Sequence, residues 1–257
     1  MKRLPVPAAL SLVILPLVFM AVYSSIREFN NQTSFTLERR EAMATLGALL
    51  IEEKFDSVVA VGVSLASRSM IYQNIEKNNW SEAIKNMESI PQTLPFIDAI
   101  SLLDKEGVMK ARFPSAPEII GKSFAYRDYY QGVSKEWKPY VSAAFKRVPE
   151  PRYNVVTVAV PIRSANQNVL GFLLLAIKVD EIVSWSKGFD AGSNGYIIVV
   201  DKKGQLVAHP QMKLGDDLTD FSSVVAVQKL LKGERGVDVF FVFVDNEGDL
   251  VAYIFVK

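Results

Sequence analysis

The sequence predicts an α+β protein, with an N-terminal transmembrane helix, a long helix after it, and two tandem modules of antiparallel sheet that carry helices. Three observations support this prediction. An apolar run without charges covers 4–23, no proline interrupts 24–75, and short apolar segments separated by turn sequences follow Pro91. The expected divisions are a transmembrane helix at 4–23, a stalk and connecting helix at 24–89, and sheet modules at 90–185 and 186–257, the second one incomplete.

The composition excludes several classes of protein. Lysine and arginine total 29 against 28 aspartates and glutamates, for a formal charge of +1. A nucleic-acid binder usually presents a strongly basic face, so this class is not expected. Hydrophobic residues make up 49% and charged residues 22%, unlike a disordered chain. With no cysteine and one histidine, disulfides, thiolate nucleophiles and Cys-based metal sites are excluded, and we expect no metal, no cofactor and no enzymatic activity.

The apolar run from Leu4 to Tyr23 follows Lys2 and Arg3, and no further charge occurs until Arg27. Twenty helical residues span about 30 Å, which matches the hydrocarbon core of a bilayer. The alternative is a cleaved secretory signal, but the run is longer than usual for one and lacks an A-x-A-like cleavage site. An uncleaved anchor in the cell membrane is favoured. Either interpretation places most of the chain outside the cytoplasm.

Residues 24–75 predict one long helix, because apolar side chains recur at helical steps between Met43 and Leu65. A helix of that length extends about 75 Å at 1.5 Å per residue, which is more than a small domain can cover. Part of it is therefore expected to pack against a second copy and form a homodimer. A second helix is expected at about Trp80–Met87, with Ser81 as its cap.

Beyond Pro91 the sequence predicts hairpins. Ile97–Leu103 and Val108–Phe113 flank the turn Asp104–Gly107, and its D-K-x-G pattern recurs at Asp201–Gly204. This recurrence indicates two modules of one fold in tandem. Further predicted strands lie at Tyr153–Ile162, Val169–Val179, Gly195–Val200, Gln205–Ala208, Asp238–Val244 and Leu250–Val256, with the last two joined by the turn Asp245–Gly248.

Four segments occur together in a characteristic order. They read F-A-Y-R-D-Y-Y-Q-G-V at 124–133, P-Y-V-S at 139–142, V-A-V-P at 158–161 and G-Y-I-I-V-V-D-K-K-G-Q-L-V-A-H-P at 195–210. From about residue 30 to its end, the chain resembles the double Cache (dCache) family of extracytoplasmic sensor domains in bacterial chemoreceptors and sensor kinases. The resemblance implies two PAS-like modules along one long helix. The membrane-distal module would bind the ligand and the membrane-proximal module would relay the signal.

Aromatic side chains surround one arginine within 124–140. A guanidinium can hold a carboxylate through two hydrogen bonds, and aromatic rings supply apolar walls and hydroxyl groups. This composition favours a small-molecule pocket for a ligand that carries a carboxylate. The alternative is that Arg127 pairs with Asp128 while the tyrosines belong to a core. The candidate ligand-binding residues are Tyr126, Arg127, Tyr129, Tyr130, Trp137 and Tyr140.

The resemblance also bears on the class of ligand. Amino-acid-sensing members of the family carry an R-x-W-Y element, an upstream tyrosine and a late aspartate. Arg127 and Tyr130 match that element and Tyr129 replaces its tryptophan, but the aspartate position falls near Ala176, where no acid exists. Asp180 is instead expected to cap a helix that begins at Glu181. The missing carboxylate favours an organic acid over an amino acid.

Other polar residues have simpler interpretations. His209 precedes a proline and has no visible triad partner, so we expect it to close a strand end. The aspartates within 216–220 lack the alternating ligands and central glycine of a calcium loop, which predicts a solvated turn. Lys146 and Arg147 are expected to be exposed charges at a strand end.

The favoured function is a membrane-anchored sensor of a small carboxylate-bearing ligand, which acts by stabilising one of two arrangements of the modules. The chain stops at Lys257 inside a predicted strand. We therefore expect no output domain of its own, and either a separate membrane signalling partner or a longer chemoreceptor or histidine kinase of which this is a fragment. The alternatives are an extracytoplasmic binding or scaffold protein without signalling, and a hydrolase, although no G-x-S-x-G element is present.

Overall fold

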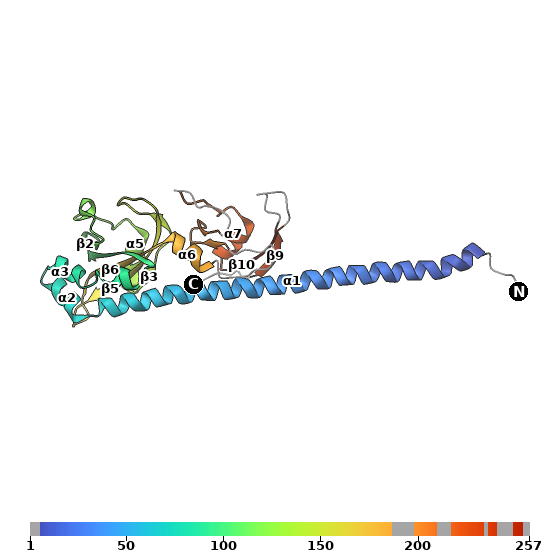
Figure 1. The fold of residues 1–257 in the computed structure, drawn as a ribbon, viewed down its shortest axis with the longest axis horizontal. Coiled ribbons are helices and arrows are strands. Elements are labelled where there is room, and N and C mark those ends of the chain that lie inside the picture. The colour runs from blue at the N-terminus through green and yellow to red at the C-terminus, as the bar shows by residue number, and fades with distance from the viewer. Residues whose placement is uncertain (1–5, 187–197, 210–216, 234–235, 241–248, 254–257) are drawn as a thin grey trace.

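The computed structural model describes residues 6–186, 198–209, 217–233, 236–240 and 249–253. One long helix, α1, runs the length of the molecule, and two groups of strands and short helices lie on one side of it (Figure 1). The helices are α1 (Val6–Ala66), α2 (Ser69–Glu76), α3 (Trp80–Lys85), α4 (Ile90–Thr93), α5 (Asp128–Glu136), α6 (Val179–Ser186) and α7 (Val225–Leu231). The strands are β1 (Ile97–Asp104), β2 (Met109–Phe113), β3 (Tyr140–Val141), β4 (Phe145–Lys146), β5 (Asn154–Arg163), β6 (Val169–Lys178), β7 (Val199–Val200), β8 (Leu206–Ala208), β9 (Gly236–Phe240) and β10 (Asp249–Tyr253).

Helix α1 ends at Ala66, so the prediction of one helix to about residue 75 is wrong at its end. The chain bends after α1, where the Ser67 hydroxyl donates to the Ser64 carbonyl at 3.0 Å. Serine side chains that bond to nearby carbonyls in this way compete with continued helix. The bend lets Ile71 of α2 pack onto the same core as Leu65 of α1.

The approach of α1 to the sheet is closest at Gly62. A Cβ atom at this position would lie 2.8 Å from Val160 Cγ2 and 3.3 Å from Leu175 Cδ1. Val58 and Leu65 flank Gly62 on the buried side of the helix. These steps of three and four residues confirm the predicted apolar stripe over this part of α1.

Two helix starts differ from the prediction. Asn79, not Ser81, caps α3, because the Asn79 side chain accepts a hydrogen bond from the backbone N–H of Glu82 at 3.4 Å. Helix α6 begins at Val179, so Asp180 lies inside its first turn and does not cap it. A carboxylate in the first turn still interacts favourably with the positive end of the helix dipole.

The larger group contains an antiparallel sheet of six strands in the order β2–β1–β6–β5–β3, with β4 also paired to β5. All four strands predicted between residues 97 and 179 are present, each within about a residue of its expected bounds. They were predictable because their apolar runs are bounded by turn signals. Helices α1, α2 and α3 pack on one face of this sheet and α5 packs on the other.

The two faces of the sheet belong to separate cores. Ile100, Val158 and Leu175 point toward α1, whereas Ala159 and Phe172 point toward α5. Successive strand residues face opposite sides, which explains why neighbours such as Val158 and Ala159 lie in different cores. A ligand on the α5 face therefore lies one layer of strands away from α1.

The D-K-x-G repeat is a true structural repeat. In the first copy, Asp104 accepts from the backbone N–H of Val108 at 2.8 Å, and Gly107 has a φ of +83°. In the second, Asp201 accepts from the N–H of Gln205 at 2.9 Å, and Gly204 has a φ of +79°. Glycine is required at the fourth position because a Cβ is unfavourable at positive φ. The two groups of strands, called the two modules below, thus share one turn construction.

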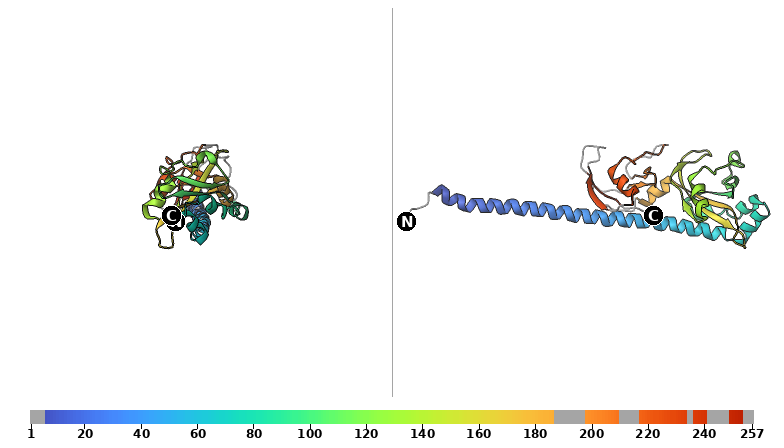
Figure 2. Two further views of the ribbon diagram at one scale, coloured as in Figure 1. Left: turned by 90° about the vertical axis from the view of Figure 1, so that its left-hand side faces the viewer. Right: turned by 180° about the vertical axis from the view of Figure 1, so that it is seen from behind.

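The smaller group follows α6. It pairs β7 with β8 and β9 with β10, both antiparallel, and α7 contacts the second pair. Strands β9 and β10 also contact α1, so this helix touches both groups of strands (Figure 2). The predicted turn at 245–248 and the predicted strand residues 195–197, 241–244 and 254–256 lie outside the described residues.

The N-terminal part of α1 extends well beyond both groups of strands (Figures 1 and 2). Within the part of the chain that the structure describes, no helix combines the length and the apolar character needed to span a bilayer. Several apolar side chains in this part of α1 are exposed, among them Leu17, Phe19, Met20, Phe29 and Phe35.

Candidate functional site

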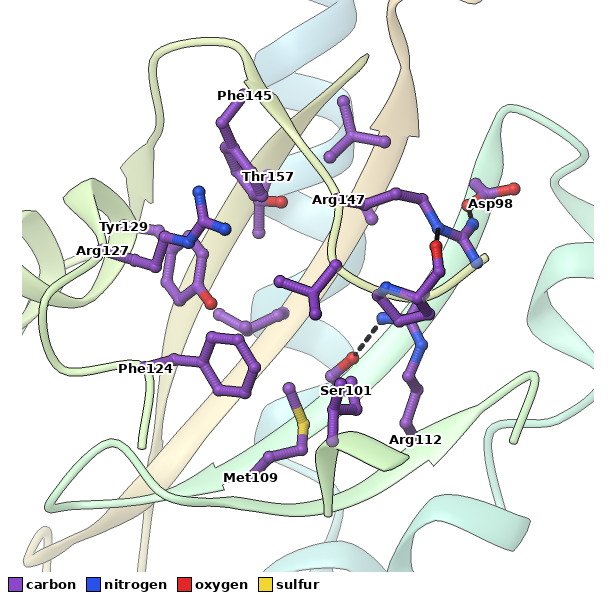
Figure 3. A pocket seen from close by; sticks show the side chains of 16 residues that line it. Asp98, Ser101, Met109, Arg112, Phe124, Arg127, Tyr129, Phe145, Arg147 and Thr157 are labelled. Carbon is purple, nitrogen blue, oxygen red and sulfur yellow. Dashed lines mark hydrogen bonds and ion pairs between the residues drawn. The ribbon is translucent and has the colours of Figure 1, made fainter. Parts of the chain in front are cut away.

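A pocket of about 50 Å³ lies on the face of the large sheet that is turned away from α1 (Figure 3). Its apolar wall includes Met109, Ile119, Phe124, Phe145 and Leu174. Its charged and hydroxyl groups come from strands β1, β2 and β5, the start of α5 and the loop after β4: Asp98, Ser101, Arg112, Arg127, Arg147 and Thr157. An apolar cavity with a few converging polar groups is the usual form of a small-molecule site.

Arg127 immediately precedes α5, with extended backbone angles and its N–H bonded to the Phe124 carbonyl at 3.0 Å. Its guanidinium carbon lies 4.8 Å from the centre of the Phe145 ring and 5.2 Å from that of Tyr126. Its Nε atom is buried without a hydrogen-bond partner. Among the described residues no carboxylate pairs with Arg127, so the alternative pairing with Asp128 does not occur.

The carboxylate of Asp128 is held by three donors, none of which is Arg127. It accepts from the Tyr140 hydroxyl at 2.9 Å, the Ala143 backbone N–H at 2.7 Å and the Lys202 ammonium at 3.1 Å. Burial opposes ionisation of Asp128, but the hydrogen bonds from Ala143, Lys202 and Tyr140 outweigh it and hold the pKa of Asp128 below its usual value. This carboxylate is therefore ionised at neutral pH.

Tyr129 is buried in the pocket wall, with its ring centre 5.6 Å from that of Phe145. Burial raises the pKa of Tyr129 well above its usual value, only partly offset by Arg127. The phenol therefore stays neutral and offers a hydroxyl, not a charge.

The other four predicted residues lie outside the pocket lining. Tyr126 is 63% exposed and covers one side of Arg127. Tyr130 and Trp137 pack on Phe172, at 5.4 Å and 5.5 Å between ring centres, and belong to the core under α5. Tyr140 bonds to Asp128, and burial followed by the influence of that carboxylate raises its pKa to about 12.

Arg147 was predicted to be an exposed charge, and this is wrong. Its side chain is 14% exposed, lines the pocket and pairs with Asp98 at 2.7 Å. The Tyr153 hydroxyl donates to both Asp98 oxygens, each at 2.7 Å. The Lys178 ammonium lies 3.3 Å from Oδ1 of Asp98, whereas Arg147 pairs with Oδ2. Arg147 is buried because the loop after β4 folds back over β1, a long-range contact that a strand-end position does not reveal. Lys146 is partly exposed and pairs with Asp217 at 3.6 Å.

Arg112 was not predicted to belong to the site. Its Nη1 atom donates to the Ser101 hydroxyl at 3.0 Å across the β1–β2 pair, and its Nε is buried without a partner. Burial lowers the pKa of Arg112, as does the neighbouring Arg147, while Asp98 raises it. The signal that could have revealed it is a charged residue between the apolar Ala111 and Phe113 near the end of a short return strand.

Ala176 of β6 lines the pocket. The family resemblance places the acid of amino-acid-sensing members near this position, and Ala176 presents a methyl group to the cavity. His209 is buried directly after β8, and burial lowers its pKa. Its location agrees with the structural role expected for it at a strand end.

A family model described as a Cache domain matches residues 22–255 of the chain. The methyl-accepting chemotaxis protein McpA of Bacillus subtilis is 21% identical over 236 residues, which cover 88% of this chain and 33% of McpA. A probable methyl-accepting chemotaxis protein of Bacillus thuringiensis is 26% identical over 137 residues, 52% of this chain and 20% of that protein. The chain thus spans a third or less of the curated relatives that it matches.

Solved structures of chemoreceptor domains have the same fold. The ligand-binding domain of the Pseudomonas fluorescens chemoreceptor CtaA, in complex with L-isoleucine, matches with a TM-score of 0.64 and 15% identity, over 88% of this chain and 87% of that one. The corresponding domain of Pseudomonas aeruginosa PctB, in complex with L-Arg, has a TM-score of 0.56 and 17% identity, over 71% of this chain and 74% of that one. At these identities the likeness is one of fold.

Proposed function

Since this chain belongs to the Cache domain family, we propose that it is the extracytoplasmic sensor part of a membrane-anchored receptor that takes part in chemotaxis. We propose that its pocket binds a small ligand through a carboxylate on Arg127. The observation that carries this assignment is a partly buried arginine whose Nε atom is buried and unpartnered at a mostly apolar cavity. The relatives named above are methyl-accepting chemotaxis proteins, which supports a sensory role over a catalytic one.

The chemistry of Arg127 suits a carboxylate. The planar guanidinium can donate two parallel hydrogen bonds, and charge-assisted bonds of this kind are stronger than neutral ones. Phe145 covers one side of the group and excludes water, so a ligand carboxylate meets a cation that is already partly desolvated. The neutral Tyr129 hydroxyl can donate a further hydrogen bond without repelling the anion.

A connection from the pocket to the second module runs through the next residue. Asp128 starts α5 directly after Arg127, and its carboxylate binds Lys202 in the turn between β7 and β8. A ligand that draws Arg127 toward the cavity also shifts the start of α5 and the Asp128 carboxylate. The signal then passes to Lys202 if the ligand stabilises one arrangement of this contact over the other.

The same proposal assigns residues 4–23 to an uncleaved membrane anchor. The absence of charge in this segment and the basic residues before it support the assignment. So does the path of α1, which continues from the strands into this segment without a break. The bulk of the chain then lies on the extracytoplasmic side of the cell membrane.

The test is a thermal-shift screen of the full chain in detergent against small organic acids and amino acids. A ligand at about 100 times its Kd adds about 2.7 kcal/mol of stability, which raises the melting temperature by several degrees. Arg127→Ala should abolish this shift. Arg152→Ala is the matched control, because Arg152 is exposed, pairs with Glu150 and lies outside the pocket. A folded wild-type chain that responds to no carboxylate, or an Arg127→Ala variant that responds normally, would contradict the proposal.

A further inference from the structure

The charges around the pocket do not balance. Three arginines line it, Arg112, Arg127 and Arg147, and among the described lining residues Asp98 is the one carboxylate. Tyr129 adds no charge, since burial keeps it protonated. The lining therefore carries two positive charges in excess, in a cavity whose other walls are mostly apolar. Uncompensated buried charge is unfavourable, and an anionic ligand removes the imbalance.

Asp98 is fully occupied by its own neighbours. One of its oxygens pairs with the Arg147 guanidinium at 2.7 Å, and the other pairs with the Lys178 ammonium at 3.3 Å. The Tyr153 hydroxyl lies 2.7 Å from both oxygens. A ligand ammonium could reach this carboxylate only by displacing one of those partners. Ala176 of β6 lies opposite Ala99, next to Asp98, and also lines the pocket. It offers only a methyl group. The site is therefore poorly equipped for the ammonium of an amino acid.

The two remaining cations stand on opposite sides of the cavity. Figure 3 shows Arg127 entering from the α5 side, with Arg112 beside Arg147 on the other. The Nε atoms of Arg112 and Arg127 are both buried and unpartnered. The Ser101 hydroxyl oxygen accepts a hydrogen bond from Arg112. The hydroxyl proton of Ser101 can therefore be donated to a ligand. Each side thus presents unused donors toward the cavity.

From this arrangement we infer that the ligand is a short dicarboxylate, with one carboxylate on Arg127 and the other on Arg112 and Ser101. This inference rests on the proposed function and narrows it to a dianion. The pocket lining also includes the apolar side chains of Met109, Phe124 and Leu174, which suit a methylene spacer. The small volume of about 50 Å³ admits only a compact molecule.

Three ligands of equal chain length separate the possibilities: succinate, butyrate and 4-aminobutyrate. They carry the same carboxylate at one end and a second carboxylate, a methyl group or an ammonium at the other. Isothermal titration of the full chain in detergent should find succinate about tenfold or more tighter than butyrate, because a second charge-assisted contact is added. 4-Aminobutyrate should bind more weakly than butyrate. Malonate and glutarate, measured beside succinate, define the best spacer.

Arg112→Gln provides the matched variant. It should reduce the succinate-to-butyrate affinity ratio to within about threefold, whereas Arg127→Ala should weaken both ligands. The succinate-to-butyrate ratio in the wild-type chain tests the inference even if Arg112→Gln fails to fold. Tighter binding of 4-aminobutyrate or L-isoleucine than of any dicarboxylate overturns the dicarboxylate inference and leaves the proposed carboxylate sensor standing. Tighter binding of inorganic phosphate overturns both. Absence of binding by every compound overturns the proposed function itself.

Discussion

The carboxylate of Asp128 lies 3.1 Å from the ammonium nitrogen of Lys202, and this ion pair joins the two modules. Asp128 follows the pocket arginine, while Lys202 belongs to the second D-K-x-G turn. Lys202 also donates to the Tyr140 hydroxyl and to the Val141 carbonyl at 3.2 Å. Beside it, Asp201 accepts from the Ala144 N–H at 2.9 Å. The turn of one module is thus bonded to the chain that borders the pocket of the other.

Removing the Asp128 carboxylate should destabilise the chain more than removing the Lys202 ammonium. Lys202→Ala removes one partly exposed cation and should cost at most about 1 kcal/mol. Asp128→Ala also leaves the Ala143 N–H and the Tyr140 hydroxyl without their acceptor, and should cost about 2–3 kcal/mol. Calorimetry of the two variants measures the difference. Equal losses would show that Asp128 does not organise the contact in the way the structure indicates.

The same pair should separate binding from communication between the modules. Lys202→Ala leaves every pocket residue in place, so ligand affinity should stay within about threefold of wild type. Hydrogen exchange at the Ala144 and Gln205 amides should slow when ligand binds to the wild-type chain and change much less in the variant. Lys203→Ala in the same turn is the control, because its exposed side chain makes no contact with Asp128. An unchanged exchange response in Lys202→Ala would exclude this route.

The pH dependence of stability should contain a contribution from Asp128. Its pKa in the folded chain is below the ordinary value of 3.8. A lowered folded-state pKa contributes stability above the unfolded pKa, and this stability is lost as the pH falls through the folded value. The difference in unfolding free energy between wild type and Asp128→Asn should therefore be constant from neutral pH to about pH 5 and shrink below pH 4. Urea titrations at several pH values measure it, and a difference that grows on acidification would contradict the assignment.

Gly62→Ala should destabilise the chain although alanine is the better helix former by about 1 kcal/mol. The new methyl group would lie 2.8 Å from Val160 Cγ2 in a packed core, and overpacking of this kind costs about 1–3 kcal/mol. Val160 cannot rotate away easily because its side chain branches at Cβ. In a Val160→Ala background the same substitution should become neutral or stabilising, as measured by urea unfolding. A loss of the same size in both backgrounds would point to another cause.

The anchor assignment predicts where the chain is found in cells. The full chain should stay with membranes after alkaline extraction, and a chain lacking residues 1–23 should be released. Ile14→Arg places a charge at the centre of the segment and should weaken insertion by about 3 kcal/mol. Mass spectrometry of the mature N-terminus distinguishes an intact anchor from a cleaved signal. Recovery of a chain that starts after residue 23 would favour the signal.

The strands of the large sheet were predictable because their apolar runs, turns and prolines are local signals. The charged half of the pocket was not, because it depends on irregular register. The β1–β6 pairing shifts between Ile97 and Ala99, and the β1–β2 pairing shifts between Leu102 and Leu103. A slip of one residue transfers side chains to the other face of a strand. Simple alternation therefore could not place Asp98 or Arg112 beside the cavity.

For the aromatic residues the sequence predicted too many members of the site. Six residues within 126–140 were grouped because they are close in sequence, but they lie before α5, within it, directly after it and on β3. Arg127 and Tyr129 reach the pocket, whereas Tyr130 and Trp137 face Phe172. Composition pointed to a segment that contributes Arg127 and Tyr129 to the pocket lining. The assignment of each ring needed the position of the sheet beneath the helix.

The close approach at Gly62 determines what kind of movement α1 can make. Sliding the helix along the sheet by one residue would bring Val61 or Val63 to a place that has no room for a Cβ atom. Tilting about Gly62 keeps the glycine where it is, so this contact acts as a fulcrum. From there to residue 24 the helix forms a lever arm of about 57 Å, at 1.5 Å per residue. Strands β9 and β10 also contact α1 and would have to move with it. A rotation of about one degree at the fulcrum would then move the far end by about 1 Å, and a very small rearrangement of the sheet would be amplified along the helix.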